Sequence, residues 1–300
     1  MKTFLVVLSF VVVSFLLAIP ALGVAYPFEE NFEEGDGDWQ IDGLWGLTSE
    51  TSMSSAHALA DSPGRFYTNG TDSAAALASS LDLSSAANPA MRFYHRHAIE
   101  TGYDEARVEV STDGGISWEN SPLATYTGNL GTWTRTQTSL ADYAGQNDIR
   151  IRFRLVSDES VIQDGWFIDD IRIAEAPAFA GITSLAASSP HSVAVEWAAG
   201  GSEVNAYRIY RSYGDSFELQ TAHLVEELPS ATNSFIDITA SPKTKYQYAV
   251  MALDAHAVHT LSAAQTVTTP AGMDFPFIDD AEGGGATWNP TSPWAISAED

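Results

Sequence analysis

One aspartate in a strand-like segment could bind a metal ion. Residues 166–173 read WFIDDIRI, and strict alternation puts Asp169 on the same face as the apolar Phe167, Ile171 and Ile173. A buried carboxylate is costly unless it is paired or metal-bound, and no Lys or Arg of this segment shares that face. Carboxylate oxygens suit calcium. Asp169 is therefore a candidate calcium ligand; alternatively, it accepts backbone hydrogen bonds.

Two other spacings could carry chemistry. His95 and His97 point to one face of a strand and could serve zinc, but no third ligand accompanies them, so exposed or hydrogen-bonded strand histidines are the favoured interpretation. Residues 111–118, STDGGISW, fit the Asp-box pattern SxDxGxxW. Sialidases carry several such boxes on propeller blades. A single copy is interpreted as a hairpin turn that Asp113 caps and Trp118 anchors.

Signatures of known catalytic sites are absent from the 300 residues. No HExxH zinc motif, GxSxG nucleophile elbow, phosphate-binding loop or dinucleotide fingerprint occurs. The chain has no cysteine, which excludes thiol catalysis and Cys-type zinc sites. Its formal net charge of −25 repels nucleic acid and anionic lipid, so neither is an expected partner.

The N-terminus indicates export. Lys2 precedes an apolar run, and small residues before position 26 suit cleavage after Ala25, so residues 1–25 are predicted to be a signal peptide. The alternative is an uncleaved anchor, but the run is short for a span of about 20 residues. No other stretch could cross a bilayer, so no integral membrane segment is expected after cleavage. Export without disulfides favours a bacterial source.

A long-period repeat shapes the organisation. Residues 28–45 read FEENFEEGDGDWQIDGLW and residues 277–294 read FIDDAEGGGATWNPTSPW, which align without a gap and pair Glu33 with Glu282 and Trp39 with Trp288. One kind of domain therefore opens near residue 26, and an incomplete second copy is expected over 275–300. That tail is predicted to be poorly packed because it cannot bury a core alone.

Strand signals dominate between these two openings. Runs that alternate apolar and polar residues are bounded by Gly, Asn, Asp, Ser and Pro, as in MRFYHRH at 91–97 and IRIRFRL at 149–155. No long segment has a helical period, although the Ala-rich residues 73–80 could form one helical turn or a loop. Many short strands predict all-β sandwiches.

The first of these sandwiches carries a family resemblance. FEENFEEGDGDW at 28–39, SSAHALADSP at 54–63 and DGWFIDDIRI at 164–173 resemble the MAM-like jelly-roll module of immune inhibitor A-type bacterial metallopeptidases. The resemblance covers residues 26–175. It implies a two-sheet jelly roll with an adhesive or substrate-targeting rather than catalytic role, often with a structural calcium ion.

Four acidic residues are the candidate ligands of that calcium. Glu33 is the acid that both copies of the opening keep, and the first and last strands of a jelly roll can lie close together. We therefore expect Glu33 and Asp169 to be ligands, with Glu30 and Asp61 as weaker additions. Alternatively, Glu33 is a surface carboxylate.

A second sandwich is predicted over residues 180–270. SVAVEW at 192–197, YRIYRS at 207–212 and KYQYAVMAL at 245–253 resemble an Ig-like fibronectin type III domain. Trp197 should be its core tryptophan, and Tyr246 matches the tyrosine-corner position, where the hydroxyl bonds upstream backbone. The expected role of this domain is that of a spacer.

These features favour an exported binding, adhesion or scaffold protein, secreted or at the cell surface, whose partner is an extracellular protein or glycan. An alternative is that they are accessory modules of a secreted peptidase or glycan hydrolase with its catalytic domain beyond residue 300. A third is a structural array of surface repeats.

Overall fold

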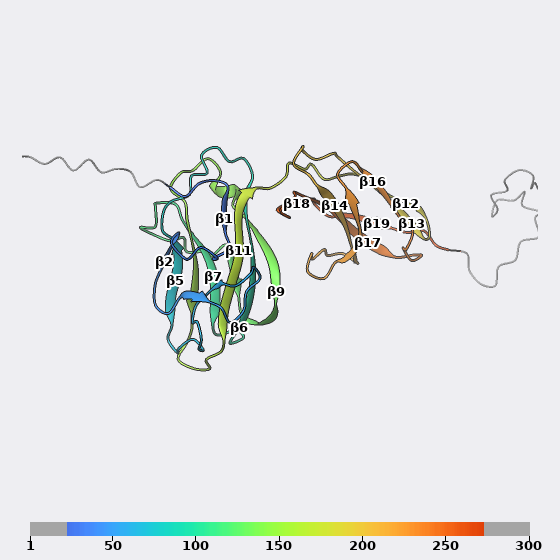
Figure 1. Ribbon diagram of the computed structural model, residues 1–300. Coiled ribbons are helices and arrows are strands. Elements are labelled where there is room, and N and C mark those ends of the chain that lie inside the picture. The colour runs from blue at the N-terminus through green and yellow to red at the C-terminus, as the bar shows by residue number, and fades with distance from the viewer. Residues whose placement is uncertain (1–22, 273–300) are drawn as a thin grey trace, which may run out of the picture. The chain divides into compact units, whose positions relative to one another are not determined.

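The computed structural model describes residues 23–272 (Figure 1). Most of the predicted signal peptide and the whole of the second opening at 275–300 lie outside these residues. The chain divides after Glu175 into two units. Within residues 23–272 the regular structure is β-strand apart from one 3-10 turn at Ala141–Tyr143, and no helix there is long and apolar enough to cross a membrane. The predicted all-β fold class is confirmed.

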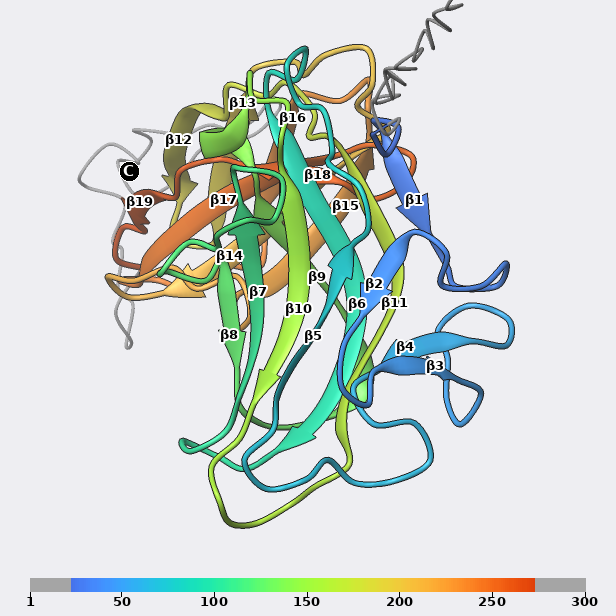
Figure 2. The same ribbon diagram turned by 90° about the vertical axis from the view of Figure 1, so that its left-hand side faces the viewer.

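The first unit is a sandwich of two antiparallel sheets (Figure 2). One sheet has the strand order β3 (Gly46–Thr48), β4 (Ala58–Ala60), β11 (Gly165–Glu175), β6 (Pro89–Ile99) and β9 (Gly128–Ser139), and β1 (Phe28–Glu30) also pairs with β11. The other has the order β2 (Trp39–Ile41), β5 (Asp72–Leu77), β10 (Arg150–Val156), β7 (Glu105–Ser111) and β8 (Ala124–Tyr126).

Strand alternation builds the core between these sheets. Phe93 of β6 and Phe153 of β10 point inward with ring centroids 5.3 Å apart, and Trp39 and Trp166 lie 5.5 and 5.4 Å from Phe153. Burial of such aromatic side chains is the main stabilising contribution in a domain without disulfides.

One Ala-rich segment differs from its prediction. Instead of a helical turn or a loop, residues 72–77 form the strand β5, which pairs with β2 and β10. Its small side chains alternate between buried and half-buried positions. Cross-strand hydrogen bonding on both sides outweighs the helical preference of alanine.

A β-bulge in β11 overturns the predicted face of Asp169. The pairing with β6 shifts between Asp169 and Arg172, and Asp170 has a left-handed φ of 48°. Trp166, Ile168, Ile171 and Ile173 therefore all join the core, whereas Asp169 lies opposite Tyr94 on the outer face. The prediction that Asp169 shares a face with Ile171 and Ile173 is wrong, because one extra residue reverses the alternation.

Asp169 is nevertheless fully buried, since the segment between β3 and β4 covers it. We call residues 49–57 the covering loop. Its Thr51 hydroxyl accepts a hydrogen bond from Trp133 Nε1 at 3.0 Å, which holds the loop over the outer face of the sheet. The sequence pattern indicated a buried carboxylate, but a loop rather than the core buries it.

The second unit is also a two-sheet sandwich. One sheet has the order β12 (Ile182–Ser189), β13 (Ser192–Trp197) and β16 (Ser234–Asp237). The other has the order β15 (His223–Pro229), β14 (Ala206–Tyr213), β17 (Lys245–Leu253) and β18 (His259–Leu261), and β19 (Gln265–Thr268) also pairs with β17.

Two aromatic residues singled out in the sequence lie in the core of this unit. The Trp197 ring is 5.4 Å from that of Tyr207. The hydroxyl of Tyr246 accepts a hydrogen bond from Ser241 N at 2.8 Å, which closes the turn upstream of β17. This contact is the geometry of a tyrosine corner.

Candidate functional site

An oxygen cluster lies beneath the covering loop of the first unit. Five acceptor oxygens surround the hydroxyl oxygen of Ser54: Asn31 O at 3.2 Å, Glu33 Oε1 at 2.8 Å, His57 O at 3.3 Å, and Asp169 Oδ1 and Oδ2 at 3.3 and 3.1 Å. A serine hydroxyl has one proton and can donate to one of them. The other oxygens receive no proton from Ser54, although the carboxylate oxygens of Glu33 and Asp169 accept backbone hydrogen bonds. Several oxygens gathered in this way could also serve as ligands of a hard cation.

A tight turn aims Glu33 at this cluster. After β1 the backbone adopts a left-handed φ of 60° at Phe32, whose side chain is fully buried. Glu33 Oε1 then accepts hydrogen bonds from Ala56 N at 2.8 Å and His57 N at 2.9 Å. These backbone hydrogen bonds, with that from Ser54, lower the pKa of Glu33 to about 2. Glu33 is therefore ionised at neutral pH.

Asp169 receives a similar set of donors. Its Oδ2 accepts hydrogen bonds from Met53 N at 2.7 Å and Ser54 N at 2.8 Å, and its Oδ1 accepts one from Asp170 N at 2.7 Å. Burial raises the pKa of Asp169 against the opposing effect of these donors. Asp169 thus accepts backbone hydrogen bonds, the alternative to calcium binding weighed from the sequence, and it also lies in the oxygen cluster. Calcium binding stays a prediction.

The two weaker candidates lie elsewhere. Glu30 Oε1 accepts a hydrogen bond from Phe32 N at 2.7 Å, within its own turn. Asp61 is buried and accepts a hydrogen bond from Trp166 N at 2.5 Å, and burial raises its pKa to about 7. Neither touches the Ser54 hydroxyl. The structure therefore brings Glu33 and Asp169 together and adds Ser54 with two carbonyl oxygens, which no spacing in the sequence identifies.

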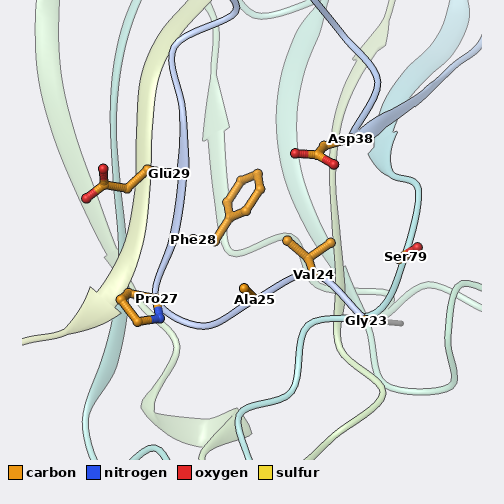
Figure 3. Close-up of a pocket in the computed structure, with 8 residues that line it drawn as sticks. All are labelled: Gly23, Val24, Ala25, Pro27, Phe28, Glu29, Asp38 and Ser79. Atoms are coloured by element: carbon orange, nitrogen blue, oxygen red, sulfur yellow. The ribbon is translucent and has the colours of Figure 1, made fainter. Parts of the chain in front are cut away.

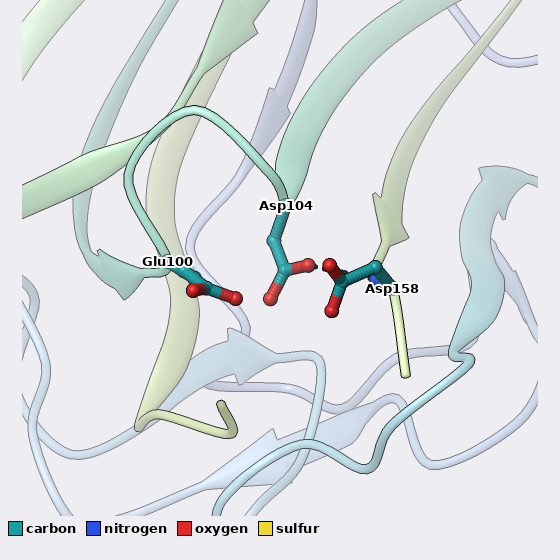
Figure 4. A group of neighbouring side chains, drawn as sticks. All are labelled: Glu100, Asp104 and Asp158. Carbon is teal, nitrogen blue, oxygen red and sulfur yellow. Dashed lines mark hydrogen bonds between the residues drawn. The ribbon is translucent and has the colours of Figure 1, made fainter. Parts of the chain in front are cut away.

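A second group of carboxylates lies at one end of the same sandwich (Figure 4). Glu100, Asp104 and Asp158 each offer an oxygen within 4.8 Å of the others. Asp104 is fully buried and accepts hydrogen bonds from Tyr67 Oη at 2.6 Å and Asp158 N at 2.8 Å. Burial and the two neighbouring carboxylates raise the pKa of Glu100. Sequence analysis missed this group because Glu100 and Asp104 come from the β6–β7 loop, whereas Asp158 comes from the distant β10–β11 loop.

The Asp-box residues lie in a turn. Asp113 Oδ1 accepts hydrogen bonds from Ser111 Oγ at 2.7 Å and Ser117 N at 2.9 Å. The Trp118 ring stacks against the guanidinium of Arg152, whose Cζ is 4.2 Å from the ring centroid. These contacts are internal to the turn and the adjacent sheet.

The strand histidines belong to the core side of β6. Both are buried, and His95 Nδ1 accepts a hydrogen bond from Trp166 Nε1 at 3.2 Å. Tyr126 packs against His95 with ring centroids 4.4 Å apart. The aromatic surroundings and the tryptophan donor occupy the histidine face, so His95 is a neutral packing residue.

His95→Asn should flatten the pH dependence of the first unit's stability. Burial and the neighbouring His97 lower the pKa of His95 to about 3 from its usual 6.5, so below pH 6.5 the unfolded chain binds a proton that the folded chain does not. Acidification therefore removes up to about 1.4 kcal/mol per pH unit, or about 2 kcal/mol by pH 5. Urea unfolding of the wild type and of His95→Asn at pH 7 and pH 5 measures how far the variant reduces this loss of stability. Protonation of Asp61 has the opposite effect on stability, but it is the same in both proteins and cancels in the comparison. Parallel pH profiles would contradict the neutral state of His95.

A pocket beside β1 is less suited to a function (Figure 3). Its walls are Gly23, Val24, Ala25, Pro27, Phe28, Glu29, Asp38 and Ser79. Cleavage after Ala25, as predicted from the sequence, removes the first three of these residues. The pocket would then lose one wall.

Comparisons with known proteins give one family match within the first unit and one match to a peptidase. The family described as Reelin subrepeat B matches residues 62–174. Bacillopeptidase F of Bacillus subtilis (strain 168) is 28% identical over 162 residues, which cover 49% of this chain and 11% of that protein. The chain thus spans about a tenth of the length of this relative. The MAM-like assignment stays a prediction.

Two solved structures that this chain resembles in part are an fn3 domain and a glycoside hydrolase domain. The fn3 domain of human contactin 1 covers 35% of this chain and 88% of its own, with 17% identity and a TM-score of 0.30. The Spr0440 glycoside hydrolase domain, Endo-D, from Streptococcus pneumoniae R6 covers 78% of this chain and 37% of its own, with 16% identity and a TM-score of 0.33.

Proposed function

We propose that this chain is an exported, non-catalytic binding or scaffold protein whose jelly-roll unit is braced by a calcium ion. The observation that carries the proposal is the set of five acceptor oxygens around the single proton of Ser54. Glu33, Ser54, Asp169 and the carbonyl groups of Asn31 and His57 would hold the ion. Hard oxygen ligands in this number are what calcium prefers.

The brace would join three segments that are distant in the sequence: the turn after β1, the covering loop and the bulge of β11. An ion that binds only the folded chain stabilises it by mass action, by about 2.7 kcal/mol at 100 times the dissociation constant. In a protein without cysteine, this contribution replaces covalent cross-linking. Secretion or display at the cell surface, with an extracellular protein or glycan as partner and the second unit as spacer, belongs to the same proposal.

Calcium should raise the melting temperature of the first unit, and Asp169→Asn should abolish the rise. The substitution keeps the shape of the side chain but removes the charge that the ion needs. Thermal unfolding in excess calcium and then in chelator measures the shift. Glu34→Gln is the matched control, since Glu34 is exposed beside Glu33, and this variant should keep the full shift. An equal shift in Asp169→Asn, or none in the wild type, would remove the metal from the proposal.

A second candidate function is that of an accessory module in a secreted peptidase or glycan hydrolase. The match to Bacillopeptidase F favours it. The two functions differ in what the gene encodes after residue 300. An HExxH or another active-site motif there would favour the enzyme, whereas further β-modules with an anchor would favour the scaffold.

A further inference from the structure

Large apolar side chains are exposed at one end of the first unit. Their exposed fractions are 55% for Phe66, 71% for Tyr103, 55% for Val161 and 45% for Ile162. They come from the β4–β5, β6–β7 and β10–β11 loops, which lie at the lower end of the unit in Figure 2. We call these four residues the apolar rim. Exposed apolar groups that gather in this way mark interaction sites more often than isolated ones do.

Hydrogen bonds tie the three loops of the rim together. Tyr67 N donates to Gln163 O at 3.1 Å, and Tyr67 Oη donates to Asp104 Oδ2 at 2.6 Å. Asp158 N donates to Asp104 Oδ1 at 2.8 Å. Phe66, Tyr103 and Ile162 are each adjacent in sequence to a residue in this network, and Val161 is two positions from Gln163. The rim is thus mounted on a fixed frame, which lowers the entropic cost of binding a partner.

Backbone strain adds a separate observation at Val161. Its φ of 46° is left-handed, a region that β-branched residues rarely occupy. Glycine or asparagine would fit this position without strain, yet an exposed valine stands there. Strain at an exposed apolar residue is an indication of function, because folding alone does not favour it.

An acidic centre lies among the loops of the rim. Glu100 and Asp158 are half-buried there, and Asp104 is fully buried beneath them. Among residues 23–272 no ion pair neutralises these three acids. Figure 4 shows the side chains of Glu100, Asp104 and Asp158 gathered at one place. Because Glu100 and Asp158 are only half-buried, a cation can reach them from outside. A cation is the complementary group, and apolar groups beside it would cover the rim.

We propose that the apolar rim and its acidic centre bind an extracellular peptide segment in which a lysine or arginine is flanked by large apolar side chains. The inference rests on the proposed binding function and names its partner class. Anionic lipid does not fit, because the three carboxylates repel its headgroups.

Binding of three synthetic peptides of equal length to the full chain tests this proposal. In each peptide, Leu and Phe flank a central pair of residues. The central pair is Lys-Arg in the basic peptide, Ser-Ser in the Ser peptide and Glu-Glu in the Glu peptide. Calorimetry should show the basic peptide binding about tenfold more tightly than the Ser peptide, and the Glu peptide not binding. Glu100→Gln should weaken only the basic peptide, by about tenfold. Asp142→Asn, an exposed acid at the other end of the unit, should leave its affinity unchanged.

Apolar variants complete the test and guard against misfolding. Val161→Gly relieves the strain, so it should fold at least as stably as the wild type and yet bind both the basic peptide and the Ser peptide more weakly. Ile116→Ser, at a residue 88% exposed on the Asp-box turn, is the matched control and should bind normally. Three results would overturn the inference. They are equal affinity for the basic and Glu peptides, an unchanged affinity of Glu100→Gln for the basic peptide, and binding to phosphatidylserine vesicles instead of the peptides. If the calcium-dependent rise in melting temperature persists in that case, the proposed function stands without this surface.

Discussion

Asp237→Ala should destabilise the second unit by about 3–5 kcal/mol, the range for breaking a buried ion pair from one side. Asp237 Oδ2 lies 2.6 Å from Arg211 Nη1, and the side chains are 0% and 7% exposed. Tyr248 Oη also donates to Asp237 Oδ2 at 2.6 Å, and Thr239 Oγ1 donates to Oδ1 at 2.7 Å. Removal of the carboxylate leaves the buried guanidinium of Arg211 and the buried phenol of Tyr248 without this acceptor.

The matched control is an ion pair of the same unit that faces solvent. Lys245 pairs with Asp215, whose side chain is 82% exposed. Asp215→Ala should cost no more than about 1 kcal/mol, because solvent screens the pair. Urea unfolding followed by hydrogen exchange within β14 and β17 reports on the second unit separately. Losses of similar size in the two variants would show that the Arg211 network does not depend on its buried charge.

Gly165→Ala should destabilise the first unit by about 3–5 kcal/mol, since overpacking and a left-handed backbone act together. Gly165 has a φ of 95°, and a Cβ there would overlap Asp61 Oδ1 and lie 2.8 Å from Asp61 Cγ. The carboxylate cannot withdraw without losing its hydrogen bond from Trp166 N. Either response disturbs the start of β11.

Gly145→Ala separates the two contributions. Gly145 has a similar φ of 84°, but nothing lies within 4 Å of the Cβ position. This variant should lose only the backbone part, about 1–2 kcal/mol. Thermal unfolding compares the variants, and equal losses would rule out steric exclusion by Asp61 as a cause.

The sequence predicts the strands better than the site. Segments such as 91–97 and 149–155 alternate cleanly, and each falls almost wholly within a strand, β6 and β10. Alternation fails at Asp169 because the bulge depends on a left-handed φ at Asp170. Aspartate can adopt this conformation but does not require it, so the residue type does not predict the bulge. The face of a carboxylate next to a bulge therefore follows from tertiary pairing, which local pattern does not contain.

Loop-built groups are harder still to predict. The repeat identifies Glu33 as a candidate ligand. Ser54 is one serine in a polar loop, so nothing in the sequence distinguishes it. The carbonyl groups of Asn31 and His57 belong to the backbone and leave no signal in the residue types. Glu100 and Asp158 come together only because β6 and β10 end at the same end of the sandwich. Such proximity is a product of topology rather than of spacing along the chain.

The bulge at Asp170 also fixes how β11 can change in length. Deletion of this one residue would restore simple alternation across the strand. If the second half of the strand kept its register, Trp166 and Ile168 would turn away from the core. If the first half kept its register, Ile171 and Ile173 would turn away instead. No substitution within the strand compensates for both halves. Related chains that gain or lose residues should therefore do so in loops away from β11 and the covering loop, while the length of β11 stays constant.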